Sequence, residues 1–175
     1  MIQTWANGKL RPFEKLSAHR LGLKHKAVAV FVMCGDRVML QQRGQDVFNL
    51  TPGLWTNTCS GHPYWDEDPA HCALRKLDDE LGIQGVYPQY RGSVECRTDL
   101  GNGVMDHEVV DIFVGEASVE LEFSPDPERV MATKWMDYFL LVAEVQENPH
   151  LYSPWLGSYL TSFSNMIFGD LASTG

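Results

Sequence analysis

The stretch TNTCSGHPYWDEDPAHCALRKLDDELGI, residues 56–83, combines a polar turn with a strongly periodic helix pattern. Asp68 is a preferred N-cap residue, and proline, here Pro69, is favoured at the first helical position. Apolar residues then recur at helical spacing up to Gly82, which is typical of a helix end: Ala70, Ala73, Leu74, Leu77 and Leu81. The pattern predicts a helix that begins at residues 68–69, ends at Gly82 and carries carboxylates along one flank, which indicates a functional site.

The length and hydropathy of the chain indicate one globular unit. The 175 residues, of which 44% are hydrophobic, suffice for one domain with a sizeable core. No run approaches the roughly 20 consecutive apolar residues that cross a bilayer, and the first residues lack a secretory-signal pattern. We therefore expect a single domain over residues 1–175, in the cytoplasm and without membrane insertion.

The net charge limits the kinds of molecule that the protein binds, and the spacing of the cysteines indicates the redox state of the thiols. The net charge of −9 argues against a nucleic-acid surface, because binding to phosphate backbones needs clustered lysines and arginines. An anionic substrate would need a local basic patch or a metal ion. The cysteines show no CxxC spacing, so we expect reduced thiols: Cys34, Cys59, Cys72 and Cys96.

Apolar periodicity elsewhere predicts strands on both sides of the central helix. The expected strands are residues 27–33 and 37–43 around a Gly35-Asp36 turn, 87–99 and 104–117 around a turn at 101–103, and 132–137. Residues 1–24 are expected to form a short hairpin or loop, and residues 122–129 a proline-rich loop. An amphipathic helix is expected over residues 138–146, and an apolar segment is expected to form a C-terminal helix over residues 153–168.

Histidines and carboxylates in separate segments form a candidate metal site: His19, His25, His62, Asp106 and Glu108. Because side chains alternate along a strand, Asp106 and Glu108 are expected on the same face. Imidazole nitrogens with carboxylate oxygens suit zinc, manganese or magnesium. The alternative interpretation places His19 and His25 in an exposed basic loop and makes His62 the cap of a turn.

The spacing in residues 61–83 resembles the Nudix signature GX5EX7REUXEEXGU, in which U is apolar. The matching residues are Gly61, Glu67, Arg75, Leu77, Glu80, Gly82 and Ile83. Lys76 stands where the signature has glutamate, and Asp79 replaces the first of its paired glutamates. The resemblance implies an α/β fold, a Nudix-type α/β/α sandwich with a mixed sheet, in which Glu80 binds a Mg²⁺ ion that bridges a diphosphate.

Flanking motifs make the resemblance more specific. The segments EKLSAH, KH, WTNTCSGHP, DHEVVDIF and SPW look like type I isopentenyl-diphosphate Δ-isomerases over residues 15–155. That family interconverts isopentenyl and dimethylallyl diphosphate in isoprenoid biosynthesis, which implies a small prenyl diphosphate as partner and a monomer or weak homo-oligomer. The resemblance implies Mn²⁺, Zn²⁺ or Mg²⁺ on His19, His25, His62, Asp106 and Glu108, with Asp106 in place of the usual glutamate.

The same resemblance implies roles for further residues. Lys15, Arg43 and Lys76 are expected to bind the substrate through its diphosphate. Trp155 is expected to face the developing carbocation, a cation–π role that its ring can fill. Glu108 and residue 60 are the expected proton carriers on opposite sides of the substrate.

Several positions depart from the family pattern. Ser60 stands where a catalytic cysteine is expected, and Cys96 stands where a tyrosine is expected. A hydroxyl is a far weaker acid than a thiol, which predicts reduced activity unless Cys59 or Cys96 supplies the thiol. Cys59 and Ser60 are adjacent and should point in different directions. Gly44 and Phe48 occupy positions where arginine and lysine are common.

Two other functions therefore stay open. A diphosphohydrolase acting on prenyl or nucleoside diphosphates would use Glu67, Asp79 and Glu80 on Mg²⁺. A non-catalytic protein that binds prenyl diphosphate would explain the missing thiol. Replacement of Ser60 by cysteine discriminates best among these hypotheses.

Overall fold

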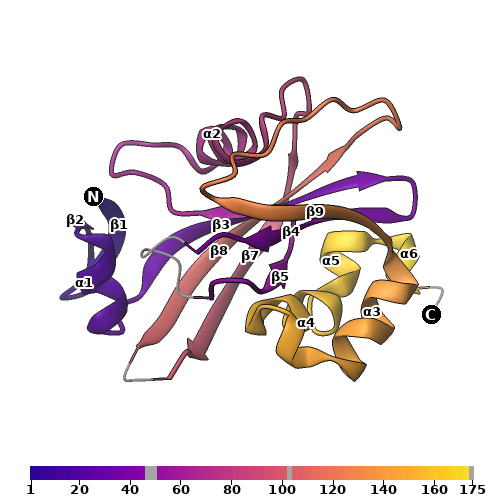
Figure 1. The fold of residues 1–175 in the computed structure, drawn as a ribbon. Coiled ribbons are helices and arrows are strands. Elements are labelled where there is room, and N and C mark those ends of the chain that lie inside the picture. The colour runs from indigo at the N-terminus through magenta and orange to yellow at the C-terminus, as the bar shows by residue number, and fades with distance from the viewer. Residues whose placement is uncertain (46–50, 102–103, 174–175) are drawn as a thin grey trace.

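A mixed sheet lies between two layers of helices in the computed structural model, which describes residues 1–45, 51–101 and 104–173 (Figure 1). Strands β3 and β8 run parallel, and the other paired strands are antiparallel. The strands are β1 (Ile2–Ala6), β2 (Lys9–Phe13), β3 (His25–Cys34), β4 (Arg37–Arg43), β5 (Trp55–Thr56), β6 (Cys59–Gly61), β7 (Gln89–Asp99), β8 (Met105–Glu116) and β9 (Val130–Asp137). The expected α/β sandwich with a mixed sheet is confirmed.

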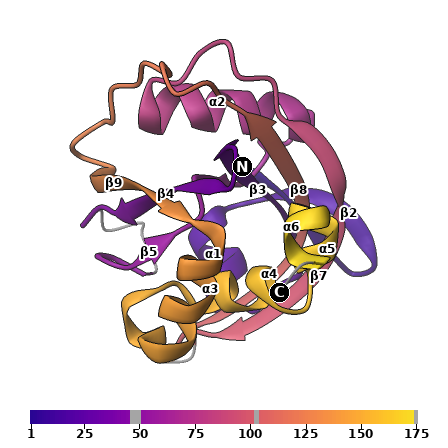
Figure 2. The same ribbon diagram turned by 90° about the vertical axis from the view of Figure 1, so that its right-hand side faces the viewer.

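Helix α2 covers one face of this sheet, and the C-terminal helices cover the other (Figures 1 and 2). The helices are α1 (Lys15–Arg20), α2 (Pro69–Leu81), α3 (Tyr138–Glu147), a 3-10 turn (Pro149–Leu151), α4 (Pro154–Leu160), α5 (Ser164–Phe168) and α6 (Asp170–Ser173). None of the described helices could span a membrane.

The central helix α2 has the caps that the sequence predicts. The Asp68 carboxylate accepts a hydrogen bond from the Ala70 N–H at 2.8 Å, and Gly82 ends the helix in the left-handed conformation, with φ of 62°. Leu77 and Leu81 are fully buried against the sheet. One face of α2 is therefore fixed to the sheet, while the face that carries Lys76 and Glu80 turns toward a cavity.

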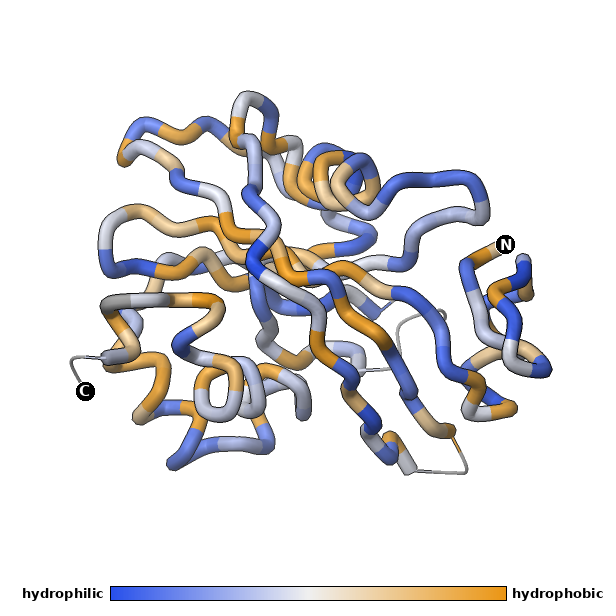
Figure 3. Tube along the Cα trace, turned by 180° about the vertical axis from the view of Figure 1, so that it is seen from behind, coloured by the Kyte–Doolittle hydropathy of each residue, from blue (hydrophilic) through white to orange (hydrophobic). Residues whose placement is uncertain are grey.

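Alternation along β3 divides the core into two layers. Ala27, Ala29 and Phe31 face the C-terminal helices, whereas Val28 and Val30 face α2. Figure 3 shows hydrophobic residues along the middle of the central strands and hydrophilic residues along many of the outer loops. All four cysteines lie in the described part of the chain and are free, as expected.

Strands β3 and β4 form the expected hairpin but pair only beside their turn, at Met33–Val38 and Cys34–Arg37. Beyond that point β6 and β8 pair with β3, whereas β5 and β9 pair with β4. The sheet thus splits into two branches. The cavity described below has walls from both branches.

The two ends of the chain differ from the sequence prediction. Residues 1–24 contain the expected hairpin, β1–β2, but also helix α1, whose N-cap Glu14 accepts from two backbone N–H groups. The single helix expected over residues 153–168 is wrong, because α4 ends before Thr161. The Thr161 hydroxyl donates to the Gly157 carbonyl, and the Ser164 hydroxyl donates to the Thr161 carbonyl, which competes with helix hydrogen bonds.

Part of the sequence prediction falls outside the described residues. Asn102 and Gly103, in the expected turn between β7 and β8, lie outside the described ranges, and so does Phe48. The strands on either side of that turn, β7 and β8, are confirmed within two residues of their expected starts and within one of the end of β8.

Leu77→Ala tests whether α2 depends on its buried face. We expect the free energy of unfolding to fall by about 2–5 kcal/mol, because the substitution leaves a cavity under the helix. Leu74, on the same helix, is 37% exposed, and Leu74→Ala is the matched control with a loss below about 1 kcal/mol. Urea denaturation measures both variants, and equal losses would contradict the assignment.

Candidate active site

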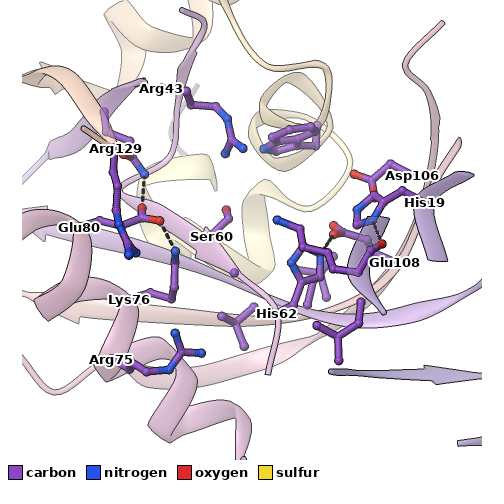
Figure 4. Close-up of a pocket in the computed structure, with 18 of the residues that line it drawn as sticks. His19, Arg43, Ser60, His62, Arg75, Lys76, Glu80, Asp106, Glu108 and Arg129 are labelled. Atoms are coloured by element: carbon purple, nitrogen blue, oxygen red, sulfur yellow. Dashed lines mark hydrogen bonds and ion pairs between the residues drawn. The ribbon is translucent and has the colours of Figure 1, made fainter. Parts of the chain in front are cut away.

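A cavity of about 400 Å³ opens between the two branches of the sheet (Figure 4). Histidines and strand carboxylates line one end: His19, His62, Asp106 and Glu108. Cationic side chains surround Glu80 at the other end: Arg43, Lys76 and Arg129. Ser60 lies between the two groups in Figure 4, and Trp155 and Tyr159 of α4 complete the lining.

The first end of the cavity brings together four of the five candidate metal ligands. One donor atom from each of His19, His25, His62 and Glu108 lies within 4.8 Å of the others. The parallel register of β3 with β8 places His25 directly beside Glu108, and their Nε2 and Oε1 atoms are 3.5 Å apart. Asp106 lies next to this group, with its Oδ1 atom 3.4 Å from His19 Nε2.

The hydrogen bonds of two histidines orient their rings toward a common centre. Nδ1 of His19 lies 2.8 Å from the Lys15 carbonyl oxygen, and Nδ1 of His25 lies 2.8 Å from the Leu23 carbonyl oxygen. A carbonyl only accepts, so each Nδ1 carries a proton, and the neutral form of each ring turns the lone pair of Nε2 toward the shared centre. His25 Nε2 and Asp106 Oδ1 are buried without a hydrogen-bond partner among the described residues. This arrangement fits a divalent metal ion.

The protonation states of two groups at this end suit a metal ion. Burial lowers the pKa of His62 to about 3, so its imidazole is neutral at pH 7. Burial alone would raise the pKa of Glu108, but the neighbouring His25 and His62 outweigh it and hold that pKa below its usual range. Neutral imidazole and ionised carboxylate are the metal-binding forms. Burial followed by the charge of Glu108 raises the pKa of Asp106, and Glu108 raises the pKa of His25 against the effect of burial, so a bound cation would shift both of these pKa values back down.

Ser60 faces the cavity from β6, but its hydroxyl is bound to an amide. Ser60 Oγ accepts from Asn57 Nδ2 at 3.1 Å and donates to Asn57 Oδ1 at 3.3 Å. Asn57 is fully buried and also donates to the Val30 and Cys59 carbonyls, which fixes its position. Cys59 points away from Ser60 into the core under α2, as expected, where burial raises the pKa of its thiol.

Cys96 lies beside Glu108 in the register of β7 with β8. It is half-buried, burial raises the pKa of its thiol to about 11, and it packs against the core instead of lining the cavity. Tyr159, which sequence analysis missed, does line the cavity. It is 2% exposed, and burial followed by the charge of Glu108 raises the pKa of its phenol well above the usual value. Its position four residues after Trp155 on one helix face was the available signal.

The opposite end of the cavity contains the expected basic residues. Lys76 Nζ forms an ion pair with Glu80 Oε1, and Gln41 Nε2 donates to Glu80 Oε2 at 3.0 Å. The Arg43 guanidinium lies 5.5 Å from the ring centre of Trp155. Burial, followed by the charges of Lys76 and Arg43, lowers the pKa of Lys15, which indicates that these cations are close together.

Glu67 and Arg75, two further residues of the Nudix-like spacing, form an ion pair with each other. Arg75 Nε and Nη2 donate to the two carboxylate oxygens of Glu67 at 2.6 and 2.7 Å. Glu67 also accepts from the Tyr64 backbone N–H at 2.9 Å. The pair therefore fixes the turn after His62 against the first half of α2.

Comparisons with known proteins agree with this geometry. A family model described as NUDIX domain matches residues 23–156. The chain is 50% identical to the isopentenyl-diphosphate Delta-isomerase of Dinoroseobacter shibae, over 99% of this chain and 98% of that protein. It is 52% identical to the isopentenyl-diphosphate Delta-isomerase of Roseobacter denitrificans, over 98% of this chain and 97% of that protein.

Solved structures share the fold at low sequence identity. A MutT protein from Methanosarcina mazei has a TM-score of 0.63 and 15% identity, over 81% of this chain and 93% of the other. The dihydroneopterin triphosphate pyrophosphohydrolase of E. coli has a TM-score of 0.58 and 18% identity, over 79% and 93%. Because the NUDIX model matches most of the chain and the two isomerases align over nearly all of it, the chain belongs to the type I isopentenyl-diphosphate Δ-isomerase family of the NUDIX superfamily.

Proposed function

We propose that this protein interconverts isopentenyl and dimethylallyl diphosphate. The observation that carries the proposal is the convergence of His19, His25, His62 and Glu108 on one wall of the cavity. Glu108 belongs to this group and also lines the cavity, so a charged proton carrier stands beside the space for the substrate. The names of the two full-length relatives support the same reaction.

The reaction adds a proton to the terminal alkene carbon and removes another from the allylic carbon, through a tertiary cation. Glu108 is ionised and half-buried, with its side chain 18% exposed, so it suits the exchange of a proton with a hydrocarbon in the cavity. Ser60 is the proposed proton carrier on the other side of the substrate. Cys96 lies beside Glu108 on the neighbouring strand β7 and is proposed to assist Glu108 in proton transfer. Trp155 offers an aromatic face to the cation.

The proposed metal ligands are His19, His25, His62, Asp106 and Glu108, for Zn²⁺, Mn²⁺ or Mg²⁺. A bound ion there would favour the ionised form of Glu108 and supply positive charge close to it. Glu80 is the proposed ligand for a second ion, Mg²⁺, which would supply positive charge to the diphosphate. Lys76 and Gln41 contact the two oxygens of Glu80, so they would have to yield one of these oxygens to such an ion.

Ser60 sets the expected rate. A hydroxyl gives up its proton far less readily than a thiol, and the Ser60 hydroxyl is also held in hydrogen bonds with Asn57. The structure holds Cys59 in the core, so a local shift of the turn would be needed to replace Ser60 by that thiol. We therefore propose a slow isomerase that binds its prenyl diphosphate substrate through Lys15, Arg43 and Lys76.

The alternative functions have less support among the described residues. A diphosphohydrolase needs several box carboxylates that are available to Mg²⁺, whereas Glu67 pairs with Arg75 and Lys76 stands where the signature has a glutamate. A binding protein without turnover remains the competing hypothesis that Ser60 motivates. It shares the cavity with the isomerase and differs from it only in the absence of proton exchange.

Metal binding is tested with His25→Asn. We expect the affinity for Zn²⁺ or Mn²⁺ to fall at least about 100-fold, because the substitution removes a ring nitrogen from the buried group. His107→Asn is the matched control, since His107 lies on β8 but pairs with the exposed Glu95. Titration calorimetry at pH 7 measures the affinities, and an unchanged value for His25→Asn would reject the ligand set.

Proton exchange at Glu108 is tested with heavy water. The parent chain, with Mg²⁺ and Mn²⁺ or Zn²⁺ present, should incorporate deuterium into isopentenyl diphosphate, and Glu108→Gln should slow this about 10²–10⁴-fold. Glu95→Gln, on the neighbouring strand, is the control with unchanged exchange. If the parent shows no exchange above buffer, the isomerase proposal is wrong.

Ser60→Cys should raise the rate of isomerisation by about 10²–10⁴-fold, because the thiol is a much better proton carrier at neutral pH. Ser60→Ala serves as the control for the change in shape and should give no increase. Product ratios by chromatography measure the rate. Little change in Ser60→Cys would indicate that the cavity serves another reaction.

A further inference from the structure

We infer that Arg129 is a further substrate-binding residue, which contacts the anionic end of the ligand and is placed there by close packing of its loop on Gly44. Neither residue was assigned this role by sequence analysis, which placed residues 122–129 in a proline-rich loop. The identity of the anion as a diphosphate rests on the proposed function. The position of Arg129 in the cavity does not.

The loop before β9 is held in place by backbone hydrogen bonds at both ends. Ser124 N donates to the Leu81 carbonyl at 2.8 Å, and Asp126 N donates to the Glu80 carbonyl at 2.9 Å. These bonds satisfy carbonyls at the C-terminal end of α2. At the other end, Gly44 N donates to the Arg129 carbonyl at 2.7 Å. The backbone of Arg129 is thus fixed between α2 and the end of β4.

Gly44 is required for this close approach. A Cβ atom at position 44 would lie 2.7 Å from the Arg129 carbonyl oxygen and 2.8 Å from the Glu128 carbonyl oxygen. Both contacts are with backbone, so a larger residue could be accommodated only by displacement of the loop. Gly44 thereby lets the loop bring Arg129 to the cavity from just before β9, across from the end of β4.

The surroundings of Arg129 suit an anion. Figure 4 shows Arg129, Lys76 and Arg43 around Glu80 at one end of the cavity. With Asp126, which pairs with Arg129, these are three cationic side chains and two carboxylates, which leaves an excess of positive charge that an anion would balance. The Arg129 side chain is 47% exposed, and its Nε atom lies 3.3 Å from Asp126 Oδ2. This pair orients the guanidinium, whose planar group of N–H donors matches phosphate oxygens.

The probe for this inference is inorganic diphosphate, titrated into the full chain by calorimetry with EDTA and again with Mg²⁺. Arg129→Gln should weaken binding at least about ten-fold, because a hydrogen bond to a charged group is lost. Arg129→Lys should retain part of the affinity. Arg91→Gln is the matched control, since Arg91 is exposed on β7 away from the cavity, and its affinity should stay within about two-fold of the parent.

Gly44→Ala tests the packing step. In a folded variant the added methyl group should displace the loop and weaken diphosphate binding as Arg129→Gln does. Parental affinity in a folded Gly44→Ala variant overturns the role of Gly44. If this variant does not fold, Arg129→Gln decides alone.

The inference and the proposed function fail in different ways. Parental affinity in Arg129→Gln, or no binding of diphosphate by the parent, overturns the inference even if the parent isomerises its substrate. Weakened binding in Arg129→Gln supports the inference even if the parent shows no turnover, an outcome that would reject only the isomerase.

Discussion

The parallel pairing of β3 with β8 is the constraint on which the site depends. It sets His25 beside Glu108, and alternation along β8 then puts Asp106 on the same face. A shift of one residue in this register would turn both carboxylates to the other face of the sheet, away from the histidines. The apolar side chains of β3 fill both layers of the core and so fix the position of this strand in the sheet. The same strand therefore also positions His25 against Asp106 and Glu108 at the strand ends.

The helix α2 and the strands around it follow from local sequence signals. Asp68, Pro69 and Gly82 have strong positional preferences, and the flanking strands have clear alternation, so these elements are confirmed close to their predicted bounds. The C-terminal region is different. Its apolar residues fit one long helix, and the break at Thr161 depends on hydroxyl-to-backbone hydrogen bonds that hydropathy does not reveal.

The sequence predicts the site residues that belong to a family pattern or to an alternating strand. It does not predict the residues that loops and short helices bring to the cavity. The three histidines come from α1, β3 and the turn after β6, and spacing alone does not predict that they meet; only the family resemblance predicted it. Arg129 and Tyr159 carry no motif. Arg129 reaches the cavity because a loop docks on α2, and Tyr159 because a short helix turns its face inward. Both are consequences of tertiary packing.

Because the sheet divides into two branches, the two ends of the cavity are built on different strands. The histidine and carboxylate end is built mainly on β3, β6 and β8, whereas the cationic end draws on β4, α2 and the loop before β9. The two groups thus rest largely on separate elements, since Ser60 lies on β6 whereas Arg43 lies on β4 and Lys76 and Glu80 on α2. In the proposed isomerase, affinity for the diphosphate and the rate of proton exchange are therefore set by different parts of the backbone.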